Sequence, residues 1–204
     1  SVAERKNPRA AVLAFQQAFS ANDLGVCLVL KMNNPAKEDL ESLQRDLAGW
    51  PNISILAGHH SRVEIDSLIN CIDCYVSLHR SEGFGLGPAE AMSVGIPCIL
   101  TDWSGNTDYM TDENCIEIDY ELVNLDIDYG PYNAGQRWAE ADVDQASRAL
   151  DLGESAPVQD EAREDDRTLS LPAPRSQSLP VRQSRAEKKT GKGGRPGAAQ
   201  DAEA

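Results

Sequence analysis

Short apolar runs and amphipathic stretches alternate as far as residue 118, and this alternation constrains the fold more than any other feature. The amphipathic stretches have apolar residues three or four positions apart and predict helices at 7–20, 35–47, 61–70, 88–94 and 104–110. The apolar runs predict strands at 26–30, 53–56, 74–78, 97–101 and 115–118. They lack in/out alternation, which is typical of strands covered by helices on both faces. The short connections then favour an α/β fold with a doubly wound, Rossmann-like parallel sheet.

Two local signals mark helix starts. Asn7 precedes Pro8, so Asn7 is expected to cap a helix whose first position is the proline. Ser61 is followed three residues later by Glu64, which is the pattern of a capping box.

The composition of the chain changes near residue 150. All eleven aromatic residues and all five cysteines lie before residue 139, so a folded domain is predicted over residues 1–150. Residues 151–204 contain Pro/Ser-rich and Gly/Lys-rich segments. Such a segment buries too little apolar surface to offset its ordering entropy. It is therefore predicted to be a disordered tail.

Charge and apolar content disfavour several classes of protein. Residues 1–150, with 23 acidic and ten basic residues, carry −13 of the net charge of −14, which argues against a nucleic acid partner. No apolar run approaches the roughly 20 residues that span a bilayer, and no signal-peptide core is present. An odd number of cysteines favours reduced thiols. We therefore expect a cytoplasmic protein without a transmembrane segment.

The sequence SEGFGLGPAE at residues 81–90 is the densest candidate site. An expected strand leads into a glycine-rich turn and a helix follows, an arrangement that gathers free backbone N–H groups into an anion site. Glu82 and Glu90 bracket the turn and suit hydroxyl donors such as sugars and ribose. On composition alone, a sugar-nucleotide site and a plain glycine-rich turn with solvated carboxylates are equally good interpretations.

These residues, followed by GIPCI at 95–99, resemble the donor-site signature of retaining glycosyltransferases with the GT-B fold, of the family-4 type (group 1). RKNP at 5–8, NISILAG at 52–58 and TDWSGNTDYMT at 101–111 are similar to other segments of the same domain. The resemblance covers residues 1–148 and implies the C-terminal half of a GT-B fold. It implies an enzyme that transfers a sugar from a nucleotide diphosphate sugar to a hydroxyl acceptor with retention.

The resemblance also implies roles for individual residues. Glu90 would bind the ribose hydroxyls, Glu82 would contact the transferred sugar, and Lys6 would neutralise the diphosphate, which makes Glu82 and Lys6 the candidate catalytic residues. The donor-binding positions of the turn would be Gly83, Phe84, Gly85 and Leu86. No metal or other cofactor is expected. The family's partner arginine lies about five residues before the lysine, where this sequence has Ser1, so this partner is expected either to be absent or to be replaced poorly by Arg5.

The sequence departs from the family pattern at both ends. The N-terminal acceptor-binding domain and the first strand of the donor domain are not recognisable, and the pattern is lost after Leu150. In a doubly wound sheet the first strand is central, so its two neighbours are expected to lack a partner. We expect the chain by itself not to transfer sugar, and whether it is an enzyme stays open.

Several alternatives remain. A non-catalytic nucleotide-sugar-binding remnant fits the same residues, and a dinucleotide-dependent oxidoreductase fits less well because its G-x-G-x-x-G is absent. Cys71 and Cys74 form a C-x-x-C that is interpreted as buried core thiols rather than a zinc or redox site. The D-x-D at residues 126–128 is interpreted as part of a solvated acidic loop, and His79 as structural.

Overall fold

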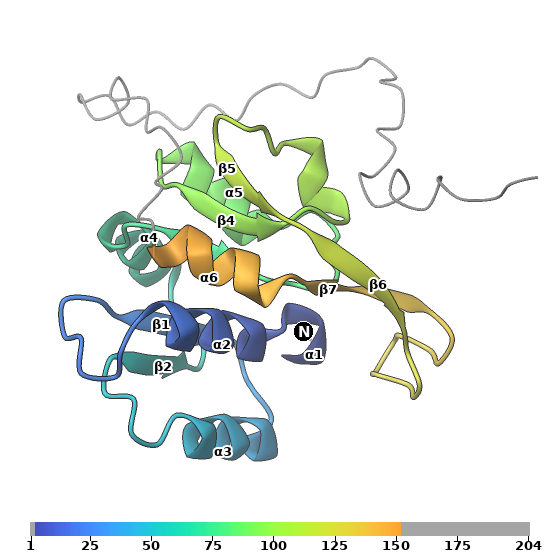
Figure 1. Cartoon of the computed structure of the whole chain (residues 1–204), viewed down its shortest axis with the longest axis horizontal. Helices are drawn as coiled ribbons and strands as arrows, with labels where there is room; N and C mark the ends of the chain where they lie inside the picture. Colours follow the sequence, from blue (N-terminus) through green and yellow to red (C-terminus); the bar gives the residue numbers. More distant parts are fainter. Residues whose placement is uncertain (1–2, 152–204) are drawn as a thin grey trace, which may run out of the picture. The chain divides into compact units, whose positions relative to one another are not determined.

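The computed structural model in Figure 1 describes residues 3–151. Helices and strands alternate through most of this region. Their bounds are α1 Ala3–Lys6, α2 Pro8–Ala18, β1 Leu28–Met32, α3 Lys37–Asp46, β2 Ile53–Ala57, α4 Arg62–Cys71, β3 Tyr75–Ser77, α5 Leu86–Ser93, β4 Cys98–Thr101, the 3-10 helix η1 Gly105–Asp108, β5 Cys115–Ile118, β6 Tyr120–Asn124, β7 Arg137–Ala141 and α6 Val143–Asp151. The predicted disordered tail falls outside the described residues, except for Asp151, which ends α6.

The strands form three small sheets. Strands β1 and β2 are parallel, with Leu28 opposite Ile53 and Met32 opposite Ala57. Strands β3, β4 and β5 form a second parallel sheet in that order, whereas β6 and β7 form an antiparallel hairpin. The predicted α/β fold with parallel strands is confirmed. Within residues 3–151, β1 pairs only with β2 and β3 only with β4, so no described strand joins the two parallel sheets.

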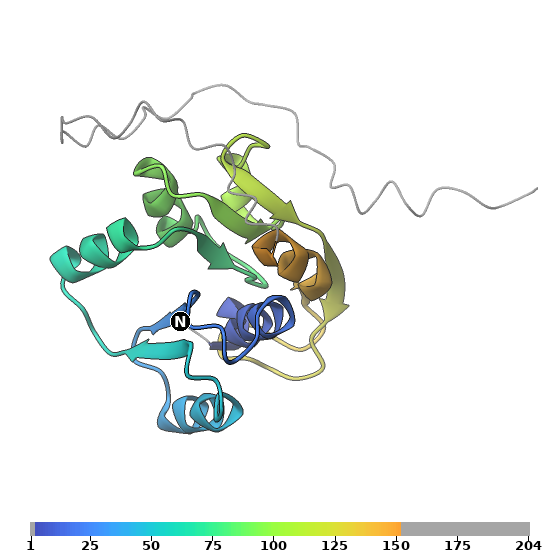
Figure 2. The same cartoon turned by 60° about the vertical axis from the view of Figure 1, so that its left-hand side comes forward.

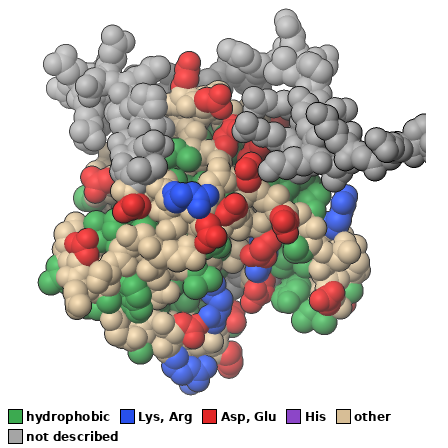
Figure 3. Space-filling view, viewed as in Figure 1, with side chains coloured by type: hydrophobic (Ala, Val, Ile, Leu, Met, Phe, Trp, Pro, Cys, Tyr) green, Lys and Arg blue, Asp and Glu red, His purple; other side chains and the backbone are tan. Residues whose placement is uncertain are grey.

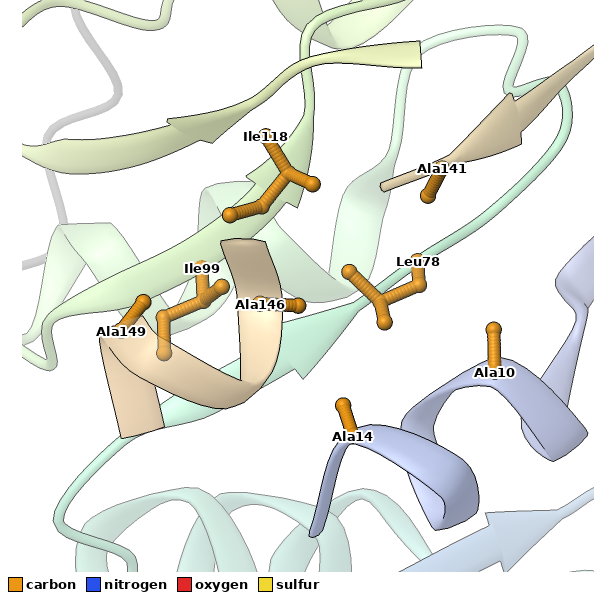
Figure 4. Packing of buried hydrophobic residues seen from close by; sticks show 8 residues of the cluster. All are labelled: Ala10, Ala14, Leu78, Ile99, Ile118, Ala141, Ala146 and Ala149. Carbon is orange, nitrogen blue, oxygen red and sulfur yellow. The ribbon is translucent and has the colours of Figure 1, made fainter. Parts of the chain in front are cut away.

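Helices cover both faces of the β3–β4–β5 sheet, as the absence of in/out alternation predicts. On one face α2 packs along α6 and contacts β3, so that Ala10 and Ala14 face Leu78 (Figure 4). The opposite face carries α4 and α5, whose Ile69 and Ala91 belong to a second buried cluster. A third cluster joins α2 and α3 to β1 and β2. Helix α2 therefore contacts both parallel sheets (Figure 2).

Most predicted helices and strands are present, with shifted ends. Strand β1 begins at Leu28 and not at residue 26, and α5 begins at Leu86, two residues before its proline. The capping box at Ser61 is confirmed, because Ser61 and Glu64 exchange both hydrogen bonds. Asn7 does precede α2, but its side chain makes no capping bond, so that part of the prediction is wrong. Its backbone is left-handed and its amide instead donates to Glu140.

The region after β5 was not assigned from the sequence. It contains the β6–β7 hairpin and α6. The sequence predicts a solvated acidic loop from Glu117 to Asp128, and this is wrong for residues 117–118 and 120–124, which belong to β5 and β6. Asp126 and Asp128 do lie in the exposed hairpin loop. The sequence signal of β6 and β7 is weak because a two-stranded hairpin with polar residues on one face has no long apolar run.

The surface of the described region carries interspersed charges. Acidic side chains are spread over the face seen in Figure 3, with Lys and Arg side chains in small groups among them. Among the described residues, no helix is both long and apolar enough to cross a membrane.

Candidate ligand-binding site

Glu82 lies in the loop between the carboxyl end of β3 and the start of α5. Its backbone is fixed on both sides by the loop that precedes η1. The Glu82 N–H donates to Ser104 Oγ at 2.7 Å, and the Gly105 N–H donates to the Glu82 carbonyl at 3.1 Å. The side chain is only 7% exposed. These bonds hold one carboxylate rigidly at the edge of the β3–β4–β5 sheet.

Two cations from α1 hold this carboxylate. Lys6 pairs with one oxygen of Glu82, and Arg5 Nη1 lies 3.0 Å from the other. Burial would raise the pKa of Glu82, but the hydrogen bonds and charges of Lys6 and Arg5 outweigh it and hold the pKa below its usual value. Arg5, which the sequence presents as a poor substitute for the missing arginine, therefore lies beside Lys6 in the same cluster.

The turn after Glu82 exposes backbone donors. In the described part of the chain, the N–H groups of Gly83, Phe84 and Gly85 donate no hydrogen bond, and Gly85 leads directly into the first turn of α5. The first N–H groups of any helix also lack partners within it. The turn and the helix start together provide several backbone donors next to Lys6 and Arg5, which is the arrangement that binds phosphate groups.

Close contacts explain two of the three glycines in the turn. Gly85 has a φ of 80°, and a Cβ there would lie 2.6 Å from the Tyr109 hydroxyl oxygen. A Cβ at Gly87 would lie 2.4 Å from the Tyr75 hydroxyl oxygen. Gly83 has neither a positive φ nor a near neighbour. Phe84 and Leu86 are more than half exposed, and the Phe84 ring centroid is 5.1 Å from that of Tyr109.

Glu90 lies in the middle of α5 and is paired with a residue that sequence reasoning missed. Arg62, at the start of α4, pairs with Glu90 and places Nη2 2.8 Å from Asp66. Burial raises the pKa of Tyr75 to about 12, and the charges of Glu82 and Glu90 contribute to this rise. Both predicted carboxylates therefore influence the pKa of the same tyrosine. No sequence signal distinguished Arg62 from other surface arginines.

His79 is fully buried two residues after the end of β3 and connects the Glu82 segment to the η1 loop. Its Nε2 lies 2.8 Å from Asn106 Oδ1, and its Nδ1 lies 3.1 Å from Ser77 Oγ. An amide oxygen only accepts, so Nε2 donates and Nδ1 accepts from the serine. Burial is the largest influence on the ring and lowers the pKa of His79. The prediction that His79 is structural agrees with these contacts.

The remaining sequence candidates lie apart from this cluster. Cys71 is exposed and Cys74 is half-buried, so the interpretation of both as buried core thiols is wrong for Cys71. Cys71 is the last residue of α4, whereas Cys74 lies beyond the helix, immediately before β3. No group of three or more His, Cys, Asp or Glu side chains in residues 3–151 is arranged to hold a metal ion. The sequence-based expectation of a metal-free reaction stays a prediction.

Comparisons with known proteins give one matching family model and similarity to two individual proteins. The family model for glycosyl transferases group 1 matches residues 1–118, more than half of the chain. The lipopolysaccharide core biosynthesis mannosyltransferase LpsB of Rhizobium meliloti (strain 1021) is 34% identical over 64 residues, which cover 31% of this chain and 18% of that protein. The match thus spans less than a fifth of the relative's length. The crystal structure of the catalytic domain of cholesterol-alpha-glucosyltransferase from Helicobacter pylori is similar with a TM-score of 0.48 and 16% identity, over 73% of this chain and 78% of that chain.

Proposed function

Because this chain belongs to the glycosyl transferases group 1 family, we propose that residues 3–151 form a domain that binds a nucleotide diphosphate sugar. The whole protein then transfers the sugar to a hydroxyl acceptor with retention of anomeric configuration. A second, acceptor-binding domain completes the active site in this proposal. The proposed location is the cytoplasm, where nucleotide sugars are the available donors.

The observation that carries the proposal is the cluster of Lys6, Arg5 and Glu82 beside the backbone donors of the turn. A diphosphate needs cations and N–H donors, whereas a sugar needs hydrogen-bond acceptors such as a carboxylate. The site provides the cations and donors as well as the carboxylate in one small cluster. The hydrogen bonds and charges of Lys6 and Arg5 keep Glu82 ionised. Neither a purely anionic nor a purely neutral ligand would use all of these groups.

The proposed chemistry is stabilisation of the leaving group. When the bond between the sugar and the diphosphate breaks, negative charge grows on the phosphate oxygens. In this proposal Lys6 and Arg5, which pair with Glu82 in the free protein, and the N–H groups of the turn stabilise that charge. Glu82 then keeps one side of the sugar fixed while the acceptor approaches. The described residues provide no basis for naming a protein nucleophile.

Glu90 is proposed to bind the two ribose hydroxyls. In the free protein one of its oxygens pairs with Arg62, whose side chain is 60% exposed and can move at little cost. Exposed ion pairs contribute about 0–1 kcal/mol, less than the hydrogen bonds that a ribose would offer. Arg62 is therefore expected to move aside or to share the carboxylate when the nucleotide binds.

Calorimetry tests the proposal with UDP-, GDP- and ADP-sugars and the corresponding free nucleotides. We expect Glu90→Gln to lower the affinity for both ligand types by about 1.5–3 kcal/mol, and Glu82→Gln to lower mainly the affinity for the sugar nucleotide. Glu38→Gln on α3 removes an exposed carboxylate elsewhere and serves as a charge-matched control. No binding of any donor, or equal effects of all three substitutions, would contradict the proposal.

A further inference from the structure

Arg80 lies two residues before Glu82, and its side chain contacts two separate elements, α1 and β7. Its Nε and Nη2 donate to Glu140 of β7 at 2.8 and 3.2 Å. Its Nη1 donates to the carbonyl of Glu4 at 2.9 Å and to the Glu4 carboxylate at 3.1 Å. The guanidinium carbon lies 5.7 Å from the centre of the Trp138 ring, within the range of a cation–π contact.

The backbone of Arg80 continues this connection. Its N–H donates to the carbonyl of Arg5 at 2.9 Å, and its carbonyl accepts from the N–H of Ala139 at 3.1 Å. Helix α1 therefore sits against the Arg80 segment, which in turn sits against β7. The Arg80 side chain is 20% exposed, so these contacts are partly shielded from water.

Helix α1 depends on these contacts for its position. It has only four residues, and a single helical turn is not stable without tertiary contacts. Arg80 holds it at Glu4, and Glu140 also accepts from the amide of the buried Asn7 at the other end. The two residues between these anchor points are Arg5 and Lys6, the cations that pair with Glu82.

From this geometry we propose that Arg80 is a positioning residue for the diphosphate end of the donor site. It fixes α1 so that Lys6 and Arg5 lie beside Glu82 and the amide-rich turn. Arg80 itself does not contact the ligand and acts through the two cations. This inference rests on the proposed donor-binding function.

The geometry also explains why arginine is needed at this position. The guanidinium binds Glu140 through two nitrogens and reaches Glu4 with the third. A lysine would keep the positive charge but cannot make these bonds in fixed directions at the same time. Arg80→Lys therefore separates a positioning role from a simple contribution of charge.

The first test measures the titration of the Glu82 carboxylate in the absence of any ligand. Carboxyl-carbon NMR of ¹³C-glutamate-labelled full chain, assigned with Glu82→Gln, follows the titration of Glu82. We expect Glu82 to titrate at higher pH in Arg80→Gln and Arg80→Lys than in the wild type, because Lys6 and Arg5 move away from it. Arg9→Gln removes a comparable ion pair between α2 and α3 and should leave the titration unchanged. An unchanged titration in both Arg80 variants would overturn the proposal.

The second test compares a nucleoside diphosphate with the corresponding monophosphate in calorimetry. The wild type should prefer the diphosphate, and Lys6→Gln should remove most of that preference. Arg80→Gln and Arg80→Lys should reduce it about tenfold while leaving monophosphate affinity within about twofold, since Glu90 is untouched. A wild type without the preference would refute the donor-binding function itself. A preference that Lys6→Gln removes but both Arg80 variants retain would refute only the role of Arg80.

Discussion

Gly105 contributes no side chain, yet it decides whether the Glu82 loop can form. A Cβ at this position would lie 1.7 Å from the carbonyl oxygen of Gly83, and backbone cannot move aside as a flexible side chain can. The same residue donates its N–H to the Glu82 carbonyl. The glycine is therefore required by the close approach of two loops.

Gly105→Ala is expected to destabilise the fold by about 1–3 kcal/mol or more and to weaken donor binding, because the two loops must separate. Chemical denaturation and calorimetry measure the two effects. Gly83→Ala is the matched control for stability, since a Cβ at Gly83 meets nothing within 4 Å. Equal stability of the two variants would show that the loops around Gly105 and the Gly83 carbonyl can separate without cost.

A single residue, His79, makes the stability of the domain depend on pH. Burial holds the pKa of His79 below its ordinary value of 6.5, so the unfolded chain takes up a proton at a higher pH than the native protein. The stabilisation that comes from keeping His79 neutral is complete above about pH 7 and decreases as the pH falls below 6.5. Glu64 and Glu82, whose pKa values are lowered from 4.5, act only in a more acidic range.

We expect the free energy of unfolding to fall between pH 7 and pH 5 with a slope of at most about 1.4 kcal/mol per pH unit. In His79→Gln this slope should largely disappear, whatever the absolute stability of the variant. Urea denaturation at several pH values measures both slopes. A variant with the wild-type slope would assign the dependence to other groups.

At the scale of elements, the start of α4 is tied to the site. The capping box of Ser61 and Glu64 ends the preceding loop immediately before Arg62, the partner of Glu90. The hydrogen bonds with Ser61 lower the pKa of Glu64. The local Ser61–Glu64 pattern thus determines where α4 begins and, with it, the position of Arg62.

Ser61→Ala should lower the stability of the chain by about 1 kcal/mol, because the Glu64 N–H loses its acceptor at the helix end. Ser67→Ala, at an exposed position inside α4, should change stability by less than about 0.5 kcal/mol. Thermal denaturation of the two variants side by side measures the difference. The capping box would be unimportant if both variants melted together.

At the scale of the whole molecule, the reactivity of the cysteines measures how accessible the core is to solvent. Cys27 and Cys71 are exposed, whereas Cys98 and Cys115 are buried under α4 and α5. Burial also raises the pKa of Cys74 to about 11 and of Cys98 to about 12, so these thiols remain protonated at neutral pH.

A chromogenic thiol reagent at pH 8 should therefore label Cys27 and Cys71 rapidly and Cys98 and Cys115 only after unfolding. Stopped-flow absorbance resolves the phases, and the double variant Cys27→Ser, Cys71→Ser should lose the fast one. Rapid reaction of all five thiols in the native chain would mean that the core between α4, α5 and β4 opens readily.

The sequence was sufficient where the signal is local and repeated. Apolar runs without alternation predicted buried strands, and β4 is buried at every position. The capping box and the strand–turn–helix around Glu82 could also be predicted, because each depends on residues close together in the chain. The β6–β7 hairpin was missed since its apolar pattern is weak, with exposed residues along β6.

Only the tertiary structure decided which charges meet. Lys6 and Arg5 are 76 or 77 residues from Glu82 along the chain, Arg62 is 28 residues from Glu90, and Arg80 is 60 residues from Glu140. Nothing in the local pattern distinguishes these arginines and lysines from solvated surface residues. Their pairing depends on how the β3 loop, α1, α4 and β7 pack around one sheet edge. The sequence thus determined the elements and the carboxylates, and packing determined the cations that hold those carboxylates in place.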